Sequence, residues 1–149
     1  MDNKQIEKGN KSILLFMGGV VGSSTKYPTG EVIIHSIHLG DKQINDFINE
    51  TKYHKSWDWI MPVVDKIMDI DITLPPNWTG FGMEIVPRGY VRIKGFPMAP
   101  AIFSNVSNEG GLLNAVWVAV VKFIEWHDEN AHCLASSPKM NEKCGLGAI

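Results

Sequence analysis

The sequence predicts an α+β fold, in which helices pack on a small antiparallel β-sheet. Two stretches, 57–68 and 111–129, carry apolar residues at the spacing of a helix. A β-branched run between glycines, 31–39, has the composition of a strand, and residues 87–89, Pro-Arg-Gly, have that of a hairpin turn. Helices and strands therefore alternate along the chain.

The chain of 149 residues is long enough to form one core without disulfides or metals. We expect a single domain over residues 1–130 and a flexible tail over 131–149, because the last stretch has no apolar periodicity. The formal net charge of −2 argues against general nucleic-acid binding, since such proteins carry a basic excess that pairs with phosphates. No apolar run approaches the ~18 residues that a membrane span requires.

Cysteine usage indicates the compartment. Both cysteines, Cys133 and Cys144, lie near the end of the chain, whereas a disulfide-built secreted domain would need more of them. We therefore expect a reducing compartment, the cytoplasm. A secretion signal is the alternative, because lysines precede an apolar run over 13–21. A pair of glycines interrupts that run, so an ordinary buried first helix is the preferred interpretation.

The first half of the chain predicts a helix and a strand. Residues 4–17 form a short helix that a glycine pair terminates. Glycine, serine, threonine and proline make 22–30 a turn segment, and the strand 31–39 follows it. Residues 40–50 are polar and fit either a loop or a short helix. Near one face of the first helix lie Ile6, Ile13, Phe16 and Met17.

The next helix has a clear start and an internal proline. Ser56 is a good N-cap, and Asp58 in the first turn suits the helix dipole. Pro62 removes a backbone hydrogen bond, so either the helix starts at Trp57 and kinks, which we prefer, or Pro62 lies near the true start. In both cases Trp57 and Met61 face inward. The predicted core stripe contains Trp57, Ile60, Met61, Val64, Ile67 and Met68.

The second half predicts a hairpin and a long helix. A loop over 71–80 precedes the hairpin 81–96, and 101–106 adds another strand. The helix 111–129 is the clearest in the chain, because its apolar and polar residues separate onto two stripes. Its core stripe contains Leu113, Val116, Trp117, Val120, Ile124 and, at its end, His127.

Three blocks resemble a known family. "NKSILLFMGG", "YHKSWDWIMPVVDKI" and "AVWVAVVKFIEWHDEN" are similar, in this order, to small uncharacterised proteins encoded by bacteriophages and by mobile elements of Bacteroidetes-type bacteria. The resemblance covers about a third of the chain and implies an α-β-α sandwich related to a small phage domain. The sequence departs from the family in the glycine-rich segment before the first strand, in the hairpin and in the tail. The family has no assigned catalytic residues, so the resemblance implies a phage protein without implying a chemistry.

Metal and catalytic sites are weakly indicated. His35 and His38 would point to opposite faces of a strand, and the spacing of His127, His132 and Cys133, with Cys144 beyond, matches no standard zinc site. We therefore predict neither metal nor cofactor. No nucleophile, zinc-protease or phosphate-loop motif is present. An enzyme acting on a nucleotide or nucleic acid, using Asp69, Asp71 or the histidines, remains the alternative function.

Binding is the preferred function, and two clusters are its candidates. Aromatic faces stack on bases and cationic side chains pair with phosphate, so a small anionic, nucleotide-like ligand would suit the start of the Ser56 helix. A host protein is the other expected target, and an oligomer interface could complete the site. In the purely structural alternative, the tryptophans belong to the core, and Lys55 and Arg88 are solvent-exposed loop residues. The candidate residues are Tyr53, His54, Lys55, Ser56 and Trp59 near the helix, with Arg88 and Arg92 on the hairpin.

The predicted function is therefore that of a non-enzymatic phage accessory protein. It would act by binding, as an anti-defence protein that sequesters a nucleotide-like signal or a host protein in the bacterial cytoplasm. Membrane association and general nucleic-acid binding are not expected.

Overall fold

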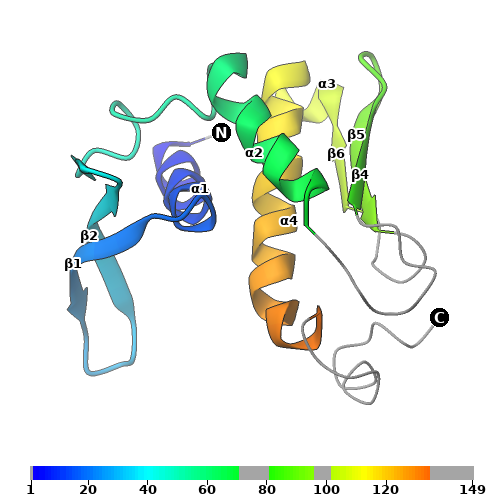
Figure 1. Cartoon of the computed structure of the whole chain (residues 1–149). Helices are drawn as coiled ribbons and strands as arrows, with labels where there is room; N and C mark the ends of the chain where they lie inside the picture. The colour runs from blue at the N-terminus through cyan, green and yellow to red at the C-terminus, as the bar shows by residue number, and fades with distance from the viewer. Residues whose placement is uncertain (1, 71–80, 96–101, 135–149) are drawn as a thin grey trace.

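The structure is a computed structural model that describes residues 2–70, 81–95 and 102–134 (Figure 1). Helices and two small sheets alternate along the chain, which confirms the predicted α+β class. The first half contains α1 (Asn3–Phe16), β1 (Val20–Lys26), β2 (Val32–Leu39), β3 (Lys42–Ile44) and α2 (Trp57–Met68). The second half contains β4 (Phe81–Ile85), β5 (Tyr90–Gly95), β6 (Ile102–Asn105), α3 (Val106–Glu109) and α4 (Leu112–Leu134).

The strands form two separate antiparallel sheets where one was expected. The first sheet has the order β1-β2-β3 and the second has the order β4-β5-β6. The first sheet was not expected, because residues 22–26 of β1 were predicted as part of a turn. Residues 23–26 instead pair with β2, and Gly22 lies at a shift in the strand register. The turn itself is confined to residues 27–30, where Gly30 has a φ of 90°, a conformation that favours glycine. Residues 42–44, expected in a loop or helix, form the short strand β3.

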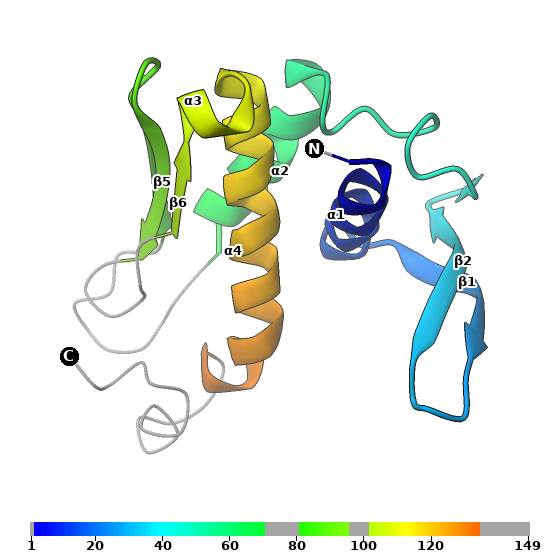
Figure 2. The same cartoon turned by 180° about the vertical axis from the view of Figure 1, so that it is seen from behind.

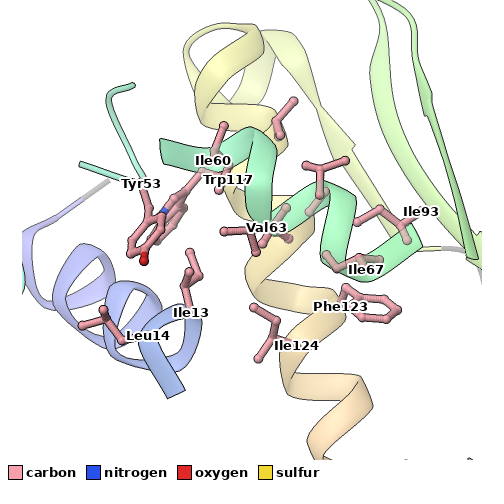
Figure 3. Close-up of a cluster of buried hydrophobic side chains, with 14 of the residues drawn as sticks. Ile13, Leu14, Tyr53, Ile60, Val63, Ile67, Ile93, Trp117, Phe123 and Ile124 are labelled. Atoms are coloured by element: carbon pink, nitrogen blue, oxygen red, sulfur yellow. The ribbon is translucent and has the colours of Figure 1, made fainter. Parts of the chain in front are cut away.

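Helix α4 is the centre of the molecule. It contacts α1, α2, α3, β5 and β6. Figures 1 and 2 show the first sheet and α1 on one side of α4 and the second sheet on the other, with α2 crossing one face of α4. Phe123 and Ile124 of α4 are fully buried, and Figure 3 shows them in the cluster that joins α1, α2 and β5. The predicted core positions Val116, Trp117 and Val120 are also buried.

Helix α1 begins with a capping box and approaches α4 very closely. The Asp2 carboxylate accepts a hydrogen bond from the Gln5 amide at 2.8 Å, and the Gln5 side chain accepts one from the Asp2 amide at 3.2 Å. Near its middle, a Cβ atom added to Gly9 would lie 2.3 Å from Cζ2 of Trp117 on α4. Only glycine allows the two helices to meet at this distance.

The buried face of α2 differs from the predicted one. Helix α2 is continuous from Trp57 with Pro62 inside it, as in the preferred alternative. However, the predicted inward residues Trp57, Met61 and Met68 are 40%, 37% and 41% exposed, respectively. Ile60, Val63, Val64 and Ile67 are the buried residues of this helix. The prediction was wrong because it read six positions as one stripe, which is wider than the face that α4 can cover.

Helix α4 also extends further than expected. It runs to Leu134, so residues 131–134, assigned to the tail, continue the helix backbone. A short helix, α3, precedes it where only a polar start was expected, and Asn105 caps α3 by accepting from the Asn108 amide. The predictions for the loop 71–80 and for the tail beyond 134 lie outside the described residues.

Candidate functional site

A buried hydrogen-bond network connects the loop before α2 to α1 and α4. Nε1 of Trp117 donates to Oδ1 of Asn10 at 2.9 Å, and Nδ2 of Asn10 donates to the Phe47 carbonyl at 2.8 Å and to Oγ1 of Thr51 at 2.9 Å. Asn10 and Thr51 are fully buried. Buried polar groups need such partners, so this network fixes the loop before α2.

His54, a predicted ligand residue, belongs to this network. Its Nδ1 lies 3.1 Å from Nδ2 of Asn10. Because the Trp117 N–H occupies the amide oxygen of Asn10, the amide nitrogen must be the group that faces His54, and it can only donate. Nδ1 of His54 is therefore unprotonated, and it shares the two Nδ2 hydrogens of Asn10 with the Phe47 carbonyl and Oγ1 of Thr51. Burial, with a smaller contribution from the Lys55 charge, lowers the pKa of His54, consistent with a neutral ring.

The aromatic faces predicted to stack on a ligand contact each other instead. The ring of Tyr53 meets that of Trp59 edge to face, with centroids 5.1 Å apart. Tyr53 is only 5% exposed, and its burial raises the pKa of its hydroxyl. Trp59 is partly buried and packs on the same core. Figure 3 shows Tyr53 inside the cluster of buried side chains. These two residues are therefore part of the core.

Two predicted residues remain at the surface beside this network. Lys55 is exposed, and Ser56 occupies the N-cap position of α2 with extended backbone angles. The Ser56 side chain makes no capping hydrogen bond. The start of α2 thus keeps a cationic side chain nearby, as predicted, but it lacks an open aromatic face.

The predicted hairpin residues are engaged with one another. Nη2 of Arg92 pairs with Oε2 of Glu84 at 2.5 Å, and the Tyr90 hydroxyl donates to Oε1 of the same carboxylate at 2.5 Å. This hydrogen bond to Glu84 raises the pKa of Tyr90. Glu84 and Arg92 are direct cross-strand partners, so the register of β4 and β5 creates the ion pair. Arg88 is exposed in the turn.

The structure does not bring the two clusters together. Figures 1 and 2 both show the first turns of α4, with α3, between the start of α2 and the turn of the β4–β5 hairpin. Arg88 and Arg92 therefore do not close a site at Ser56 within one chain. The sequence could not reveal this separation, since it depends on the path of α4 between the two segments.

The histidines considered as metal ligands have other neighbours. Nε2 of His35 lies 2.6 Å from Oγ1 of Thr25, across the first sheet. His127 stacks on Phe123 with centroids 5.8 Å apart and meets Phe16 edge to face at 6.0 Å. Burial lowers the pKa of His127. Within 2–70, 81–95 and 102–134, no group of three or more His, Cys, Asp or Glu residues could hold a metal ion. Asp71, Cys144 and the side chains of His132 and Cys133 lie outside the described part.

Two hollows flank α1. One, of about 410 Å³, lies between α1 and α4, and its lining includes Val118 and Val121 together with Lys8, Lys122 and Glu125. The other, of about 340 Å³, lies between α1 and β2. Its lining includes Lys4, Lys8 and Lys11, which follow one stripe of α1, together with Glu7 and Glu31.

The second hollow has a partly neutralised basic wall. Lys11 pairs with Glu7 at 3.3 Å, and its ammonium also lies 5.1 Å from the centre of the Phe47 ring. Lys4 and Lys8 are exposed. This arrangement provides cationic groups for a small anion, but they lie on α1 rather than at the predicted start of α2.

The outward side of α2 is a surface that the sequence prediction missed. Trp57, Met61 and Met68, the apolar stripe, share one face because they are four and seven residues apart. Figure 1 shows α2 lying on the viewer's side of α4, with no labelled element in front of it. The signal was available: Val63 completes a compact buried face with Ile60, Val64 and Ile67, which leaves these three residues outside it.

A row of carboxylates runs beside the apolar stripe. Asp58, Asp65 and Asp69, the acidic stripe, are all exposed and recur at helical spacing. Pro62 lies on the same side and has no N–H, so the Asp58 carbonyl lacks its usual helical donor. The outward side of α2 therefore combines large apolar side chains with hydrogen-bond acceptors and negative charge.

Comparisons with known proteins identify no relative: no family model, no curated protein and no solved structure matches this chain. The resemblance to phage proteins therefore stays a prediction. Among the described residues, no helix has the length and apolar content to cross a membrane.

Proposed function

We propose that this chain is a non-enzymatic binding protein whose target is a host protein. One observation carries the proposal: α2 exposes Trp57, Met61 and Met68 in one stripe while a different set of residues completes the core. Clustered large apolar side chains at the surface mark interaction sites, and tryptophan and methionine are enriched in the centres of protein interfaces. The resemblance to phage proteins supports an accessory, anti-defence role in the cytoplasm of a bacterial host.

Site-specific photo-crosslinking tests this function. A photoreactive amino acid replaces Met61 on the apolar stripe or, as the control, exposed Asn49 in the loop before α2. We expect a discrete protein adduct in host cells from position 61 and none from position 49. Excess unlabelled protein should suppress the adduct, and the variant Trp57→Gln should weaken it. Equal labelling from both positions would contradict the proposal.

A small anionic ligand is a second candidate, supported by the lysines beside the hollow between α1 and β2. Phosphate groups pair with such ammonium groups. Incubating the purified protein with a panel of nucleotides distinguishes the possibilities. Intact nucleotide released on denaturation, and lost in the variant Lys4→Ala/Lys8→Ala, would support sequestration at this hollow. Turnover of a nucleotide would instead support the alternative enzyme function.

A further inference from the structure

The chemistry of the partner follows from the composition of the α2 surface, if the proposed function holds. We infer that the partner presents an apolar cleft or helix face flanked by basic side chains. The apolar stripe would enter that apolar surface, and the acidic stripe would meet the basic residues beside it. This inference rests on the proposed function and specifies the class of protein that satisfies it.

The negative charges of α2 lie on one side of the helix, and they indicate which charge a partner should carry. Asp58, Asp65 and Asp69 are exposed on the outward side of the helix. The cationic residue of the same helix, Lys66, is directed elsewhere: its ammonium donates to the Phe16 carbonyl on α1 at 2.5 Å and lies 5.0 Å from the centre of the Phe16 ring. Apart from Lys55, which precedes the helix, the charged side chains beside the apolar stripe are therefore acidic, and complementary charge across an interface favours a basic partner.

The backbone of α2 adds a further acceptor on this side. Pro62 deprives the Asp58 carbonyl of its helical donor, so this carbonyl, like the Asp58 carboxylate, is available to a donor from outside the helix. Arginine and lysine side chains carry several donors and no acceptor. Such donors match the carboxylates and the free carbonyl beside the apolar stripe.

The same charges argue against a second copy of this chain as the occupant. In a twofold dimer through this face, both copies would contribute the same three carboxylates to the interface. Like charges brought together in this way oppose association. A different protein with basic flanks avoids this repulsion, so we commit to a heterologous partner.

A pair of synthetic helical peptides provides the probe. Each has about 18 residues, or five helical turns, with leucine on one face and either lysine or glutamate on the other. Affinities for the full chain are measured by fluorescence anisotropy. We expect the leucine/lysine peptide to bind and the leucine/glutamate peptide to bind at least about tenfold more weakly. Met61→Gln should weaken binding of the leucine/lysine peptide, since it removes the centre of the apolar stripe.

Matched neutralisation separates the local charge from the net charge. The variant Asp58→Asn/Asp65→Asn/Asp69→Asn should lose at least about tenfold in affinity for the leucine/lysine peptide. The control Glu125→Gln/Asp128→Asn/Glu129→Gln removes the same charge from exposed positions on α4 and should change it less than about twofold. Circular dichroism establishes that both variants are folded. Equal losses in the two variants would overturn the inference, because net charge alone would then explain binding.

Photo-crosslinking in cells distinguishes this inference from the proposed function. If the adduct at position 61 survives neutralisation of the acidic stripe but is lost in Trp57→Gln, the chain binds a protein whose flanks are not basic, and only the inference fails. If position 61 gives no specific adduct, the proposed function itself fails. A dimer in sedimentation that Met61→Asp dissociates would identify a second copy as the occupant and would also overturn the inference.

Discussion

At the scale of the residue, Asn10 has more structural consequence than any candidate ligand residue. Its side chain accepts from α4 and donates to the loop before α2, so one amide joins three segments that are far apart in the sequence. The orientation of that amide also determines which nitrogen of His54 lacks a proton. The sequence offered no sign of this role, because an asparagine within a helix is ordinarily exposed.

Replacing Asn10 should therefore destabilise the protein strongly. Asn10→Ala leaves the Trp117 N–H buried without its acceptor and removes the donor to Phe47 and Thr51. Unsatisfied buried groups cost about 1–3 kcal/mol each, so we expect a loss of roughly 3 kcal/mol or more in the free energy of unfolding. Urea denaturation measures it. Asn3→Ala, which changes an exposed asparagine of the same helix, should cost far less. A loss below about 0.5 kcal/mol for Asn10→Ala would contradict the role assigned to it.

The histidines predict how stability depends on pH. Burial lowers the pKa of both His54 and His127 below the ordinary value of 6.5. The unfolded chain then takes up protons at a higher pH than the folded one, so the free energy of unfolding decreases as pH falls below about 6.5 towards the folded-state values. Well above about pH 6.5 both histidines are neutral in the folded and the unfolded chain, so they no longer lower the free energy of unfolding. Protonating His54 would also place an N–H against the Asn10 amide hydrogens.

Thermal denaturation between pH 7 and pH 5 measures this effect. We expect the Tm of the wild type to fall across that range and the fall to be smaller in the double variant His54→Gln/His127→Gln. The carboxylates Asp46 and Glu50, whose pKa values are lowered mainly by hydrogen bonds from Asn49 and from the Asp46 amide, respectively, titrate below this window. An equally steep fall in the double variant would assign the acid sensitivity to other groups.

At the scale of the element, α2 shows what the sequence could and could not predict. Ser56, Pro62 and the apolar spacing predicted its start, its internal proline and its amphipathic character. The buried face was not, because α2 has more apolar residues than one face can hold. The start of α2 was correctly recognised as a place where charged and aromatic residues gather, yet burial of Tyr53 and Trp59 depends on long-range packing that local sequence does not encode.

The prediction for β1 was wrong for a different reason. Glycine, serine and threonine are typical of turns, and all seven residues of β1 are exposed, so no buried alternation marks it as a strand. Pairing with the β-branched strand β2 overrides that local preference. The long helix α4 was predicted correctly through most of its length, because its buried and exposed residues separate clearly.

The two faces of α2 should respond differently to mutation. Ile60→Ala removes a fully buried side chain, and such changes cost about 2–5 kcal/mol. Trp57→Ala changes an exposed side chain and should cost less than about 1 kcal/mol. Urea denaturation of both variants provides the comparison. If Trp57→Ala destabilised the protein as much as Ile60→Ala, the apolar stripe would be part of the core and unavailable to a partner.

At the scale of the whole molecule, the close contact between Gly9 of α1 and Trp117 of α4 helps to join α1 to the rest. Gly9→Ala would place a methyl group within 2.3 Å of Trp117, whose indole is buried and held by Asn10. Alanine improves helix propensity by about 1 kcal/mol, but overpacking commonly costs about 1–3 kcal/mol and an overlap this severe lies at the upper end. We therefore expect net destabilisation and a lower Tm.

A matched glycine provides the control for that measurement. Gly82 in β4 has open space where a Cβ would be added, so Gly82→Ala should leave the Tm nearly unchanged. If Gly9→Ala were neutral or stabilising, α1 would be able to shift on α4, and the position of the hollow between these helices would not be fixed.

The central position of α4 also determines when during synthesis the protein can fold. Each sheet uses three strands that are consecutive in the chain, so both sheets can pair as soon as their own segments leave the ribosome. The helix that contacts α1, α2, β5 and β6 comes after all of them. Until α4 emerges, the apolar surfaces that pack on it stay uncovered, and the nascent chain is open to chaperones and proteases. The native state is thus reached only once α4 has been synthesised.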